Sequence, residues 1–162
     1  MSLELFPNIS LSARLLVYTS NQTLSDEDAL AFSNSIEKFI SAWKAHGTQL
    51  DASSLLIANR VLLIAVDEQS QTATGCSIDS LNRFLQSSNI DWFSRNWVLY
   101  NQDSKSLESN WNVSDLSDFH EGCKSGQIPL SSYVLNTTVL TLKDGRKDLV
   151  QTVSESWHMR ML

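Results

Sequence analysis

The chain has 162 residues, of which 42% are hydrophobic and 19% charged, and its formal net charge is −6. These values are typical of one folded domain, and they exclude a disordered or low-complexity chain. An acidic chain without a basic stripe lacks the charge that phosphate backbones and anionic membrane surfaces attract, so we expect neither as a partner.

The first half of the chain predicts a strand, a helix and two further strands. Residues 14–19 are rich in apolar and β-branched side chains, which is typical of a strand. Ser25 is a suitable N-cap for a helix that runs to about His46 and stops at Gly47, with acids in its first turn. Two strands follow at residues 53–58 and 61–67, joined by a tight turn.

The second half predicts two more helices and three more strands. A helix over residues 77–88, capped by Ser77, precedes a strand at 97–100 and a polar loop over 101–112. A third helix runs from a cap at Ser114 through Lys124. A strand at 133–142 and a hairpin turn at Asp144-Gly145 lead into a last strand at 149–153.

The predicted fold class is therefore α+β, with a mainly antiparallel sheet and two or three helices in a single domain over residues 1–162. The first six elements have the order of a ferredoxin-like β-α-β-β-α-β unit, followed by an α-β-β extension.

The strongest candidate for chemistry is the polar loop that follows the apolar run at residues 61–66. It delivers Cys76 to the start of a predicted helix, where free amides favour a thiolate. His46, Asp67 and Asp79 are the side chains that could orient or accept a proton beside it. The alternative is structural: a cysteine often packs as a small hydrophobe, and Asp79 suits the positive end of the helix dipole.

Four segments of the chain resemble a family of small bacterial proteins of uncharacterised function, some of which carry the label ABC transporter ATPase. The segments are Ala13-Arg-Leu-Leu-Val-Tyr18, Trp43-Lys-Ala-His-Gly47, Ala65-Val-Asp-Glu68 and Gly75-Cys-Ser-Ile-Asp-Ser80. The resemblance implies a small single-domain protein, and it brings no catalytic residues.

The sequence does not support an ATPase. A phosphate-binding loop needs the pattern Gly-x-x-x-x-Gly-Lys-Ser/Thr, and no glycine of this chain is followed by lysine. We therefore predict no binding of ATP.

Other patterns concern metals, location and partners. His120 and Cys123 share a helical face, but no paired spacing supplies two more ligands, so we predict no metal and no cofactor. The N-terminal residues show no signal peptide, and two cysteines make no disulfide framework, which predicts a cytoplasmic location. The apolar C-terminus around Trp157 either docks on its own domain or forms a homodimer contact.

Two functions remain open from the sequence. The first is a non-enzymatic binding or assembly module with a protein or small-molecule partner, indicated by the missing catalytic motif and the high aromatic content. The second is a thiol-dependent enzyme or thiol sensor centred on Cys76. Whether the chain is an enzyme is left open, and the first function is favoured.

Overall fold

The apolar run at residues 61–66 lies at the centre of the fold. In the computed structural model, which describes residues 4–162, this run belongs to β5 (Val61–Asp67), the middle strand of a three-stranded sheet. Its neighbours β1 (Arg14–Thr19) and β4 (Asp51–Ile57) both pair with it antiparallel over their whole length. All six residues of the run are buried, so both faces of this sheet are covered.

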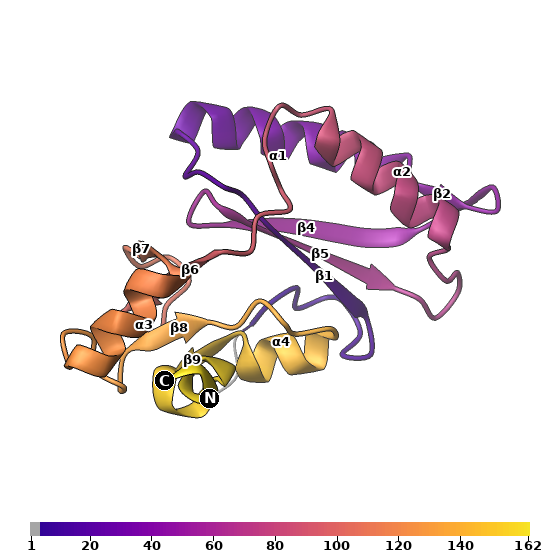
Figure 1. Ribbon diagram of the computed structural model, residues 1–162. Coiled ribbons are helices and arrows are strands. Elements are labelled where there is room, and N and C mark those ends of the chain that lie inside the picture. The colour runs from indigo at the N-terminus through magenta and orange to yellow at the C-terminus, as the bar shows by residue number, and fades with distance from the viewer. Residues whose placement is uncertain (1–3) are drawn as a thin grey trace.

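Two helices cover one face, as Figure 1 shows. The first, α1 (Asp26–Ser41), is capped by Ser25, whose side chain accepts a hydrogen bond from the Asp28 N–H at 3.1 Å. The second, α2 (Gly75–Gln86), begins with a reciprocal capping box between Thr74 and Ser77. Their apolar sides pack on alternate residues of the strands. The buried side chains of this layer include Phe32, Ile36, Ile40, Trp43, Leu62, Ile64, Leu81, Leu85 and Trp92.

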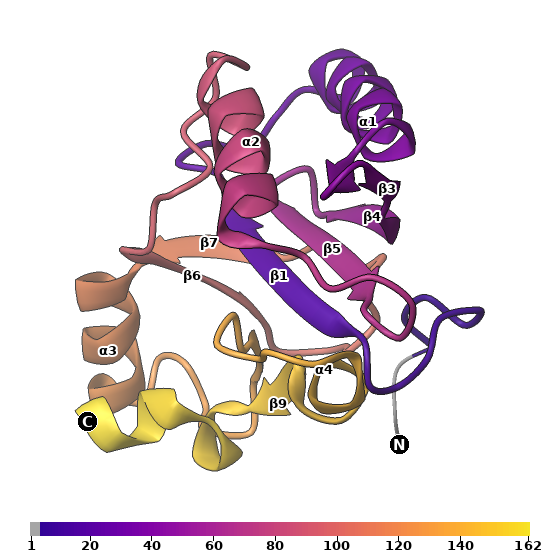
Figure 2. The ribbon, with the colours of Figure 1, turned by 90° about the vertical axis from the view of Figure 1, so that its right-hand side faces the viewer.

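A second sheet covers the other face (Figure 2). Its strands are β6 (Trp97–Asn101), β7 (Asn112–Asp115), β8 (Tyr133–Leu135) and β9 (Val150–Thr152), in the spatial order β7-β6-β8-β9 with antiparallel pairing. The helix α4 (Leu142–Asp148) packs between the sheets. The intervening core contains Leu15, Leu63, Leu99, Leu135, Leu142 and Leu149.

The outer face of the second sheet is covered by α3 (Leu116–Ser125), with a separate small core around Phe119. The chain ends in two short 3₁₀ helices, η1 (Val153–Glu155) and η2 (Trp157–Met161). His158 of η2 is buried, whereas Met159 and Met161 are exposed. The C-terminus thus docks in part on its own chain.

The predicted α+β class and the antiparallel pairing are confirmed, with four α-helices among residues 4–162. The ferredoxin-like arrangement holds for three strands, because β1 and β4 run parallel with β5 between them. The fourth strand of such a unit would be β6, and β6 belongs to the second sheet instead. In place of a fourth strand, the segment before β6 makes an isolated parallel bridge to β1, from Thr19 to Phe93.

The first helix ends earlier than predicted, at Ser41 rather than about His46. The next residues form a small hairpin of β2 (Lys44–Ala45) and β3 (Thr48–Gln49), with His46 and Gly47 at its tip in left-handed backbone conformations. The physical reason lies in Trp43, whose indole N–H donates to the Ser77 carbonyl at 2.8 Å. This bond and burial of the ring hold the chain against α2.

The start of the second helix was also predicted wrongly. Thr74, not Ser77, is the N-cap, and Ser77 is the third helical residue. The third helix is capped by Asp115 rather than Ser114, because the preceding residues pair with β6 as β7.

The prediction of a hairpin turn at Asp144-Gly145 is wrong as well. Both residues lie inside α4, whose N-cap is Thr141. The predicted strand over 133–142 shortens to β8 for the same reason. Gly145 serves close packing: a Cβ at this position would lie 2.6 Å from Leu15 Cδ2. The glycine that suggested a turn therefore lets a helix approach β1.

We predict that Ile36→Ala lowers the free energy of unfolding by ~2–5 kcal/mol, because it leaves a cavity between α1 and the sheet. Ile36 is 1% exposed, whereas Leu30 on the same helix is 65% exposed. Leu30→Ala is the matched control and should change the free energy by less than ~0.5 kcal/mol. Urea unfolding followed by circular dichroism measures both, and equal effects would contradict this packing.

Candidate functional site

The four residues predicted to carry chemistry come from three different elements: α2, the β2–β3 hairpin and β5. Cys76 is the second residue of α2 and is exposed, and Asp79 is exposed one turn later. His46 lies at the tip of the β2–β3 hairpin rather than at the end of a helix. Asp67 is the last residue of β5. Within residues 4–162 no hydrogen bond joins any two of these four side chains.

The carboxylates after β5 order their own loop. Asp67 accepts a hydrogen bond from the Gln69 N–H at 3.1 Å, and Glu68 accepts one from the Ala73 N–H at 2.8 Å. These bonds position the chain for the start of α2. Both carboxylates therefore have a structural explanation that needs no substrate.

No group of three or more His, Cys, Asp or Glu side chains in the described part of the chain could hold a metal ion. Cys123 of α3 is buried, and burial raises the pKa of its thiol. Burial, with a smaller effect of Lys124, lowers the pKa of His120. The pair packs around Phe119 in the outer core.

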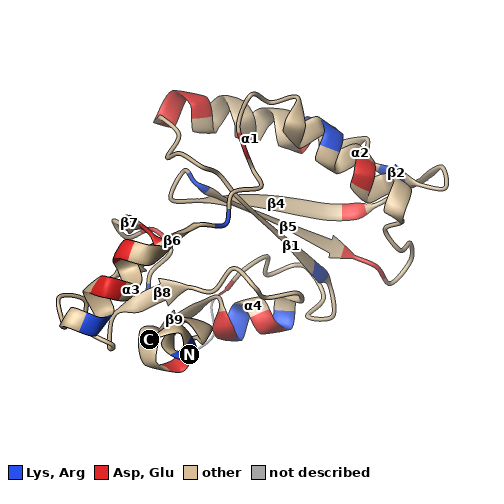
Figure 3. Cartoon of the chain, viewed as in Figure 1, with Lys and Arg blue, Asp and Glu red and all other residues tan. Residues whose placement is uncertain are grey.

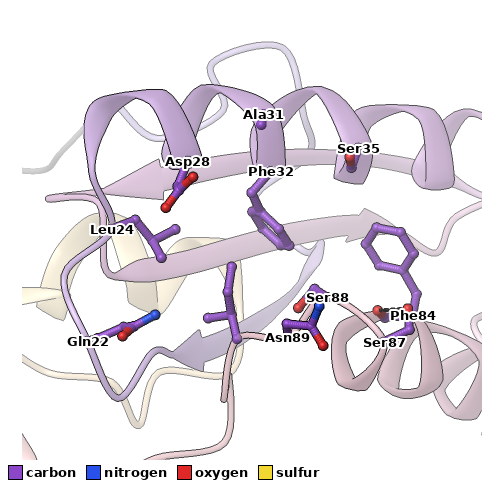
Figure 4. A pocket seen from close by; sticks show the side chains of 11 residues that line it. Gln22, Leu24, Asp28, Ala31, Phe32, Ser35, Phe84, Ser87, Ser88 and Asn89 are labelled. Atoms are coloured by element: carbon purple, nitrogen blue, oxygen red, sulfur yellow. Dashed lines mark hydrogen bonds between the residues drawn. The ribbon is translucent and has the colours of Figure 1, made fainter.

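The structure does form a cleft elsewhere, between α1 and the C-terminal end of α2 (Figure 4). Its volume is about 480 Å³, within the range of small-molecule sites. Phe32 from α1 and Phe84 from α2 enter it from opposite helices, with ring centroids 6.5 Å apart. The remaining lining residues are Gln22, Leu24, Asp28, Ala31, Ser35, Ser87, Ser88, Asn89 and Ile90.

A continuous aromatic cluster makes the floor of this cleft rigid. Trp92 is completely buried behind Phe32, at 4.6 Å between ring centroids. Phe39 stacks on Phe84 at 4.8 Å. Trp92 therefore lies behind the cleft and supports the Phe32 ring. Phe32 is 5% exposed, so the half-buried ring of Phe84 offers most of the aromatic surface that a flat apolar group could contact.

The rim of the cleft is polar and carries one charge. Asp28 lies in the acidic first turn of α1, seen in red in Figure 3, and its side chain borders the cleft in Figure 4. Its carboxylate has no hydrogen-bond partner within residues 4–162, and no lysine or arginine is among the lining residues. The cleft thus combines an apolar floor with an unpaired negative charge.

Sequence reasoning missed this cleft for two reasons. Asp28 was explained by the helix dipole, which accounts for any acid in a first turn. Phe84 lies next to the buried residues Leu81 and Leu85 of α2, and no role was predicted for it from the sequence. The sequence did contain one indication of the cleft: Phe84 is a large aromatic residue at a position next to the buried face of its helix.

A buried serine–histidine pair holds the C-terminus. Ser156 Oγ lies 3.0 Å from His158 Nδ1 and donates to the Val153 carbonyl at 3.0 Å. Trp157 stacks on the imidazole at 3.9 Å, and Phe119 meets its edge. His158 is 2% exposed, so a substrate cannot reach the pair. The pair instead holds the C-terminal segment against the rest of the chain.

Comparisons of the chain with protein-family models, curated proteins and solved structures found no match. Across residues 4–162, no helix combines the length and apolar character needed to cross a membrane.

We predict that the two thiols differ strongly in reactivity because Cys76 is exposed and Cys123 is buried. A disulfide reagent such as Ellman's should modify one thiol per folded chain rapidly. The second should react only as the protein unfolds. Cys76→Ser should remove the rapid phase alone. Two rapid equivalents, or a rapid phase that survives in Cys76→Ser, would contradict this assignment.

We also predict that His158 makes the protein less stable in mild acid. Burial lowers the pKa of His158 to about 4 from its ordinary 6.5, and nearby His120 adds to the shift. The unfolded chain therefore binds a proton below pH 6.5 that the folded chain does not bind until about pH 4. This contribution to stability is complete above pH 6.5 and is lost between pH 6.5 and 4, at a cost of up to about 3 kcal/mol.

The measurement is the free energy of unfolding of the full chain, by urea titration at pH 7.5 and pH 4.5. His158→Gln should flatten the pH dependence, whereas His46→Gln, at an exposed position, should leave it as in the original chain. An unchanged slope in His158→Gln would show that other groups cause the acid sensitivity.

Proposed function

We propose that this protein is a non-enzymatic binding module whose cleft between α1 and α2 takes a small ligand with an apolar ring and a positive charge. The observation that carries the proposal is the rigid floor of Phe32 and Phe84 beside the unpaired carboxylate of Asp28. The ring would lie on the aromatic floor and the cation would meet Asp28.

Three properties of the cleft support this ligand class. Its volume of about 480 Å³ accommodates a molecule of one or two rings. The polar rim, which includes Ser35 and Asn89, offers hydrogen bonds that would orient the ligand. The chain carries a net charge of −6, which favours approach of cations over anions.

The thiol-dependent alternative has one observation in its favour, the exposure of Cys76 in the first turn of α2. Against it stands the lack, within residues 4–162, of any hydrogen bond that joins Cys76, His46, Asp67 or Asp79 to another of the four. We therefore favour the binding proposal over the thiol-dependent alternative. It also agrees with a small bacterial protein of the resembled family that works in the cytoplasm without a catalytic centre.

The test uses 2-phenylethylamine and 3-phenylpropionate, which carry the same ring and opposite charges. Binding to the ¹⁵N-labelled full chain is followed by amide chemical shifts. We expect the amine to saturate shifts in residues 28–35 and 84–90, and the carboxylate to bind at least about tenfold more weakly. Asp28→Asn should remove most of the difference between the two probes.

Two matched variants separate the cleft from the rest of the surface. Ala31→Trp fills the cleft, whereas Leu30→Trp places the same side chain at an adjacent exposed position outside the lining. The amine should no longer bind Ala31→Trp and should bind Leu30→Trp normally. Equal binding to both variants, or a preference for the carboxylate, would overturn the proposal.

A further inference from the structure

The two edges of the three-stranded sheet differ. β1 is one edge, and several of its outward backbone groups already have hydrogen-bond partners. The Leu15 N–H donates to the Leu140 carbonyl at 2.9 Å, and the Thr19 N–H donates to the Trp92 carbonyl at 3.1 Å. Arg95 reaches the Val17 carbonyl at 2.9 Å. This edge is closed to further pairing.

β4 is the other edge, and it is open, as its place at the rim of the sheet in Figure 2 indicates. In an antiparallel ladder every second residue directs its N–H and C=O away from the neighbouring strand. Within residues 4–162, the backbone of residues 51–56 has no hydrogen bond beyond those to β5. None of these six residues is buried.

β4 also lacks the usual protection of an open edge. Natural edge strands are kept from pairing by short length, charged side chains, proline or bulges. The other sheet ends in β7 and β9, which have four and three residues. β4 has seven residues, Asp-Ala-Ser-Ser-Leu-Leu-Ile, with a single charge at its first position and an unbroken register.

Two grooves follow this edge along its whole length. One of about 410 Å³ borders the first half of β4 and is flanked by Glu37 and Ser41 of α1. The other, of about 640 Å³, borders residues 55–58 and is flanked by Leu107 and Glu108 of the loop before β7. Leu55 is 38% exposed beside it. An extended segment paired with β4 would therefore contact α1 beside the first half of the strand and the loop before β7 beside the second half.

The charges of these grooves indicate what kind of segment fits. Their lining includes the acids Glu4, Glu37, Asp51 and Glu108 and no lysine or arginine. A second copy of β4 would bring its own acids to the same place. A segment with basic ends would instead be attracted by the negative charges that line the edge.

We propose that β4 binds an extended segment of a partner protein that adds a strand to the sheet, with apolar or β-branched residues in its middle and lysine or arginine at its ends. The main-chain bonds to β4 supply affinity, and the four acids select basic flanks. This site is distinct from the cleft between α1 and α2, because no residue lines both.

The test uses a fluorescein-labelled peptide of seven alternating valines and threonines with two lysines at each end, followed by fluorescence anisotropy with the full chain. A peptide with glutamates in place of the lysines should bind at least about tenfold more weakly. Two further peptides carry N-methyl groups on alternate residues, in the two possible phases. In one peptide the methyl groups block the N–H groups that face β4, and its affinity should fall at least about tenfold. The other peptide should bind with the affinity of the parent peptide.

Matched variants locate the site. Glu37→Gln and Glu108→Gln should each lower the affinity for the lysine peptide by about 2- to 5-fold, the range expected for one exposed charge pair. Glu121→Gln makes the same change on exposed α3 and should have no effect, and Ala31→Trp, which fills the other cleft, should have none either.

Three results would overturn the proposal: no saturable binding of the lysine peptide, equal binding of both charge types, or equal loss with both N-methyl phases. Sedimentation velocity provides a fourth. A dimer of the chain alone that Leu55→Lys dissociates would show that the edge pairs with a second copy instead of a basic partner.

Discussion

Burial of β5 on both faces is the constraint on which the rest of the structure depends. Six consecutive apolar residues, 61–66, alternate between the two sides of the sheet, so neither side can face water. One side is closed by α1 and α2 and the other by the second sheet with α4. The turn that leads into β5 is tied to the second sheet by Arg60, whose guanidinium lies 4.2 Å from the centre of the Trp97 ring.

The sequence predicted the parts of the fold that local patterns determine. The Ser25 cap and the acids of the first turn identified the start of α1, and the apolar run identified β5. Patterns that depend on distant contacts misled the prediction. Gly145 leaves room for Leu15, which lies against it, and β6 pairs with β7 and β8, two strands that come later in the chain, instead of with β1.

The candidate site was harder to predict than the fold, because it depends on how two helices meet. Cys76 and His46 are rare residue types that attract attention in a sequence, yet the structure keeps them on separate surface elements. The cleft instead uses Phe32, Phe84 and Asp28, residue types common in any helix. Their combination arises only where the beginning of α1 lies beside the end of α2.

Both proposed binding surfaces follow from the same layered arrangement. The cleft lies between the beginning of α1 and the end of α2 on one face of the first sheet, and the open edge is β4, the outer strand of the same sheet. Both are acidic, in agreement with the net charge of the chain. Cations are therefore favoured at each surface, as a ring-bearing ligand at one and as basic flanks of a strand at the other.

Amide hydrogen exchange of the folded chain tests most directly whether the sheet is closed at β1 and open at β4. The amides of β1 and β5 should exchange only by global unfolding, while alternate amides of β4 exchange at rates close to those of exposed backbone. Uniform protection of β4 at the level of β5 would contradict an open edge, and rapid exchange along β5 would contradict its place at the centre of the fold.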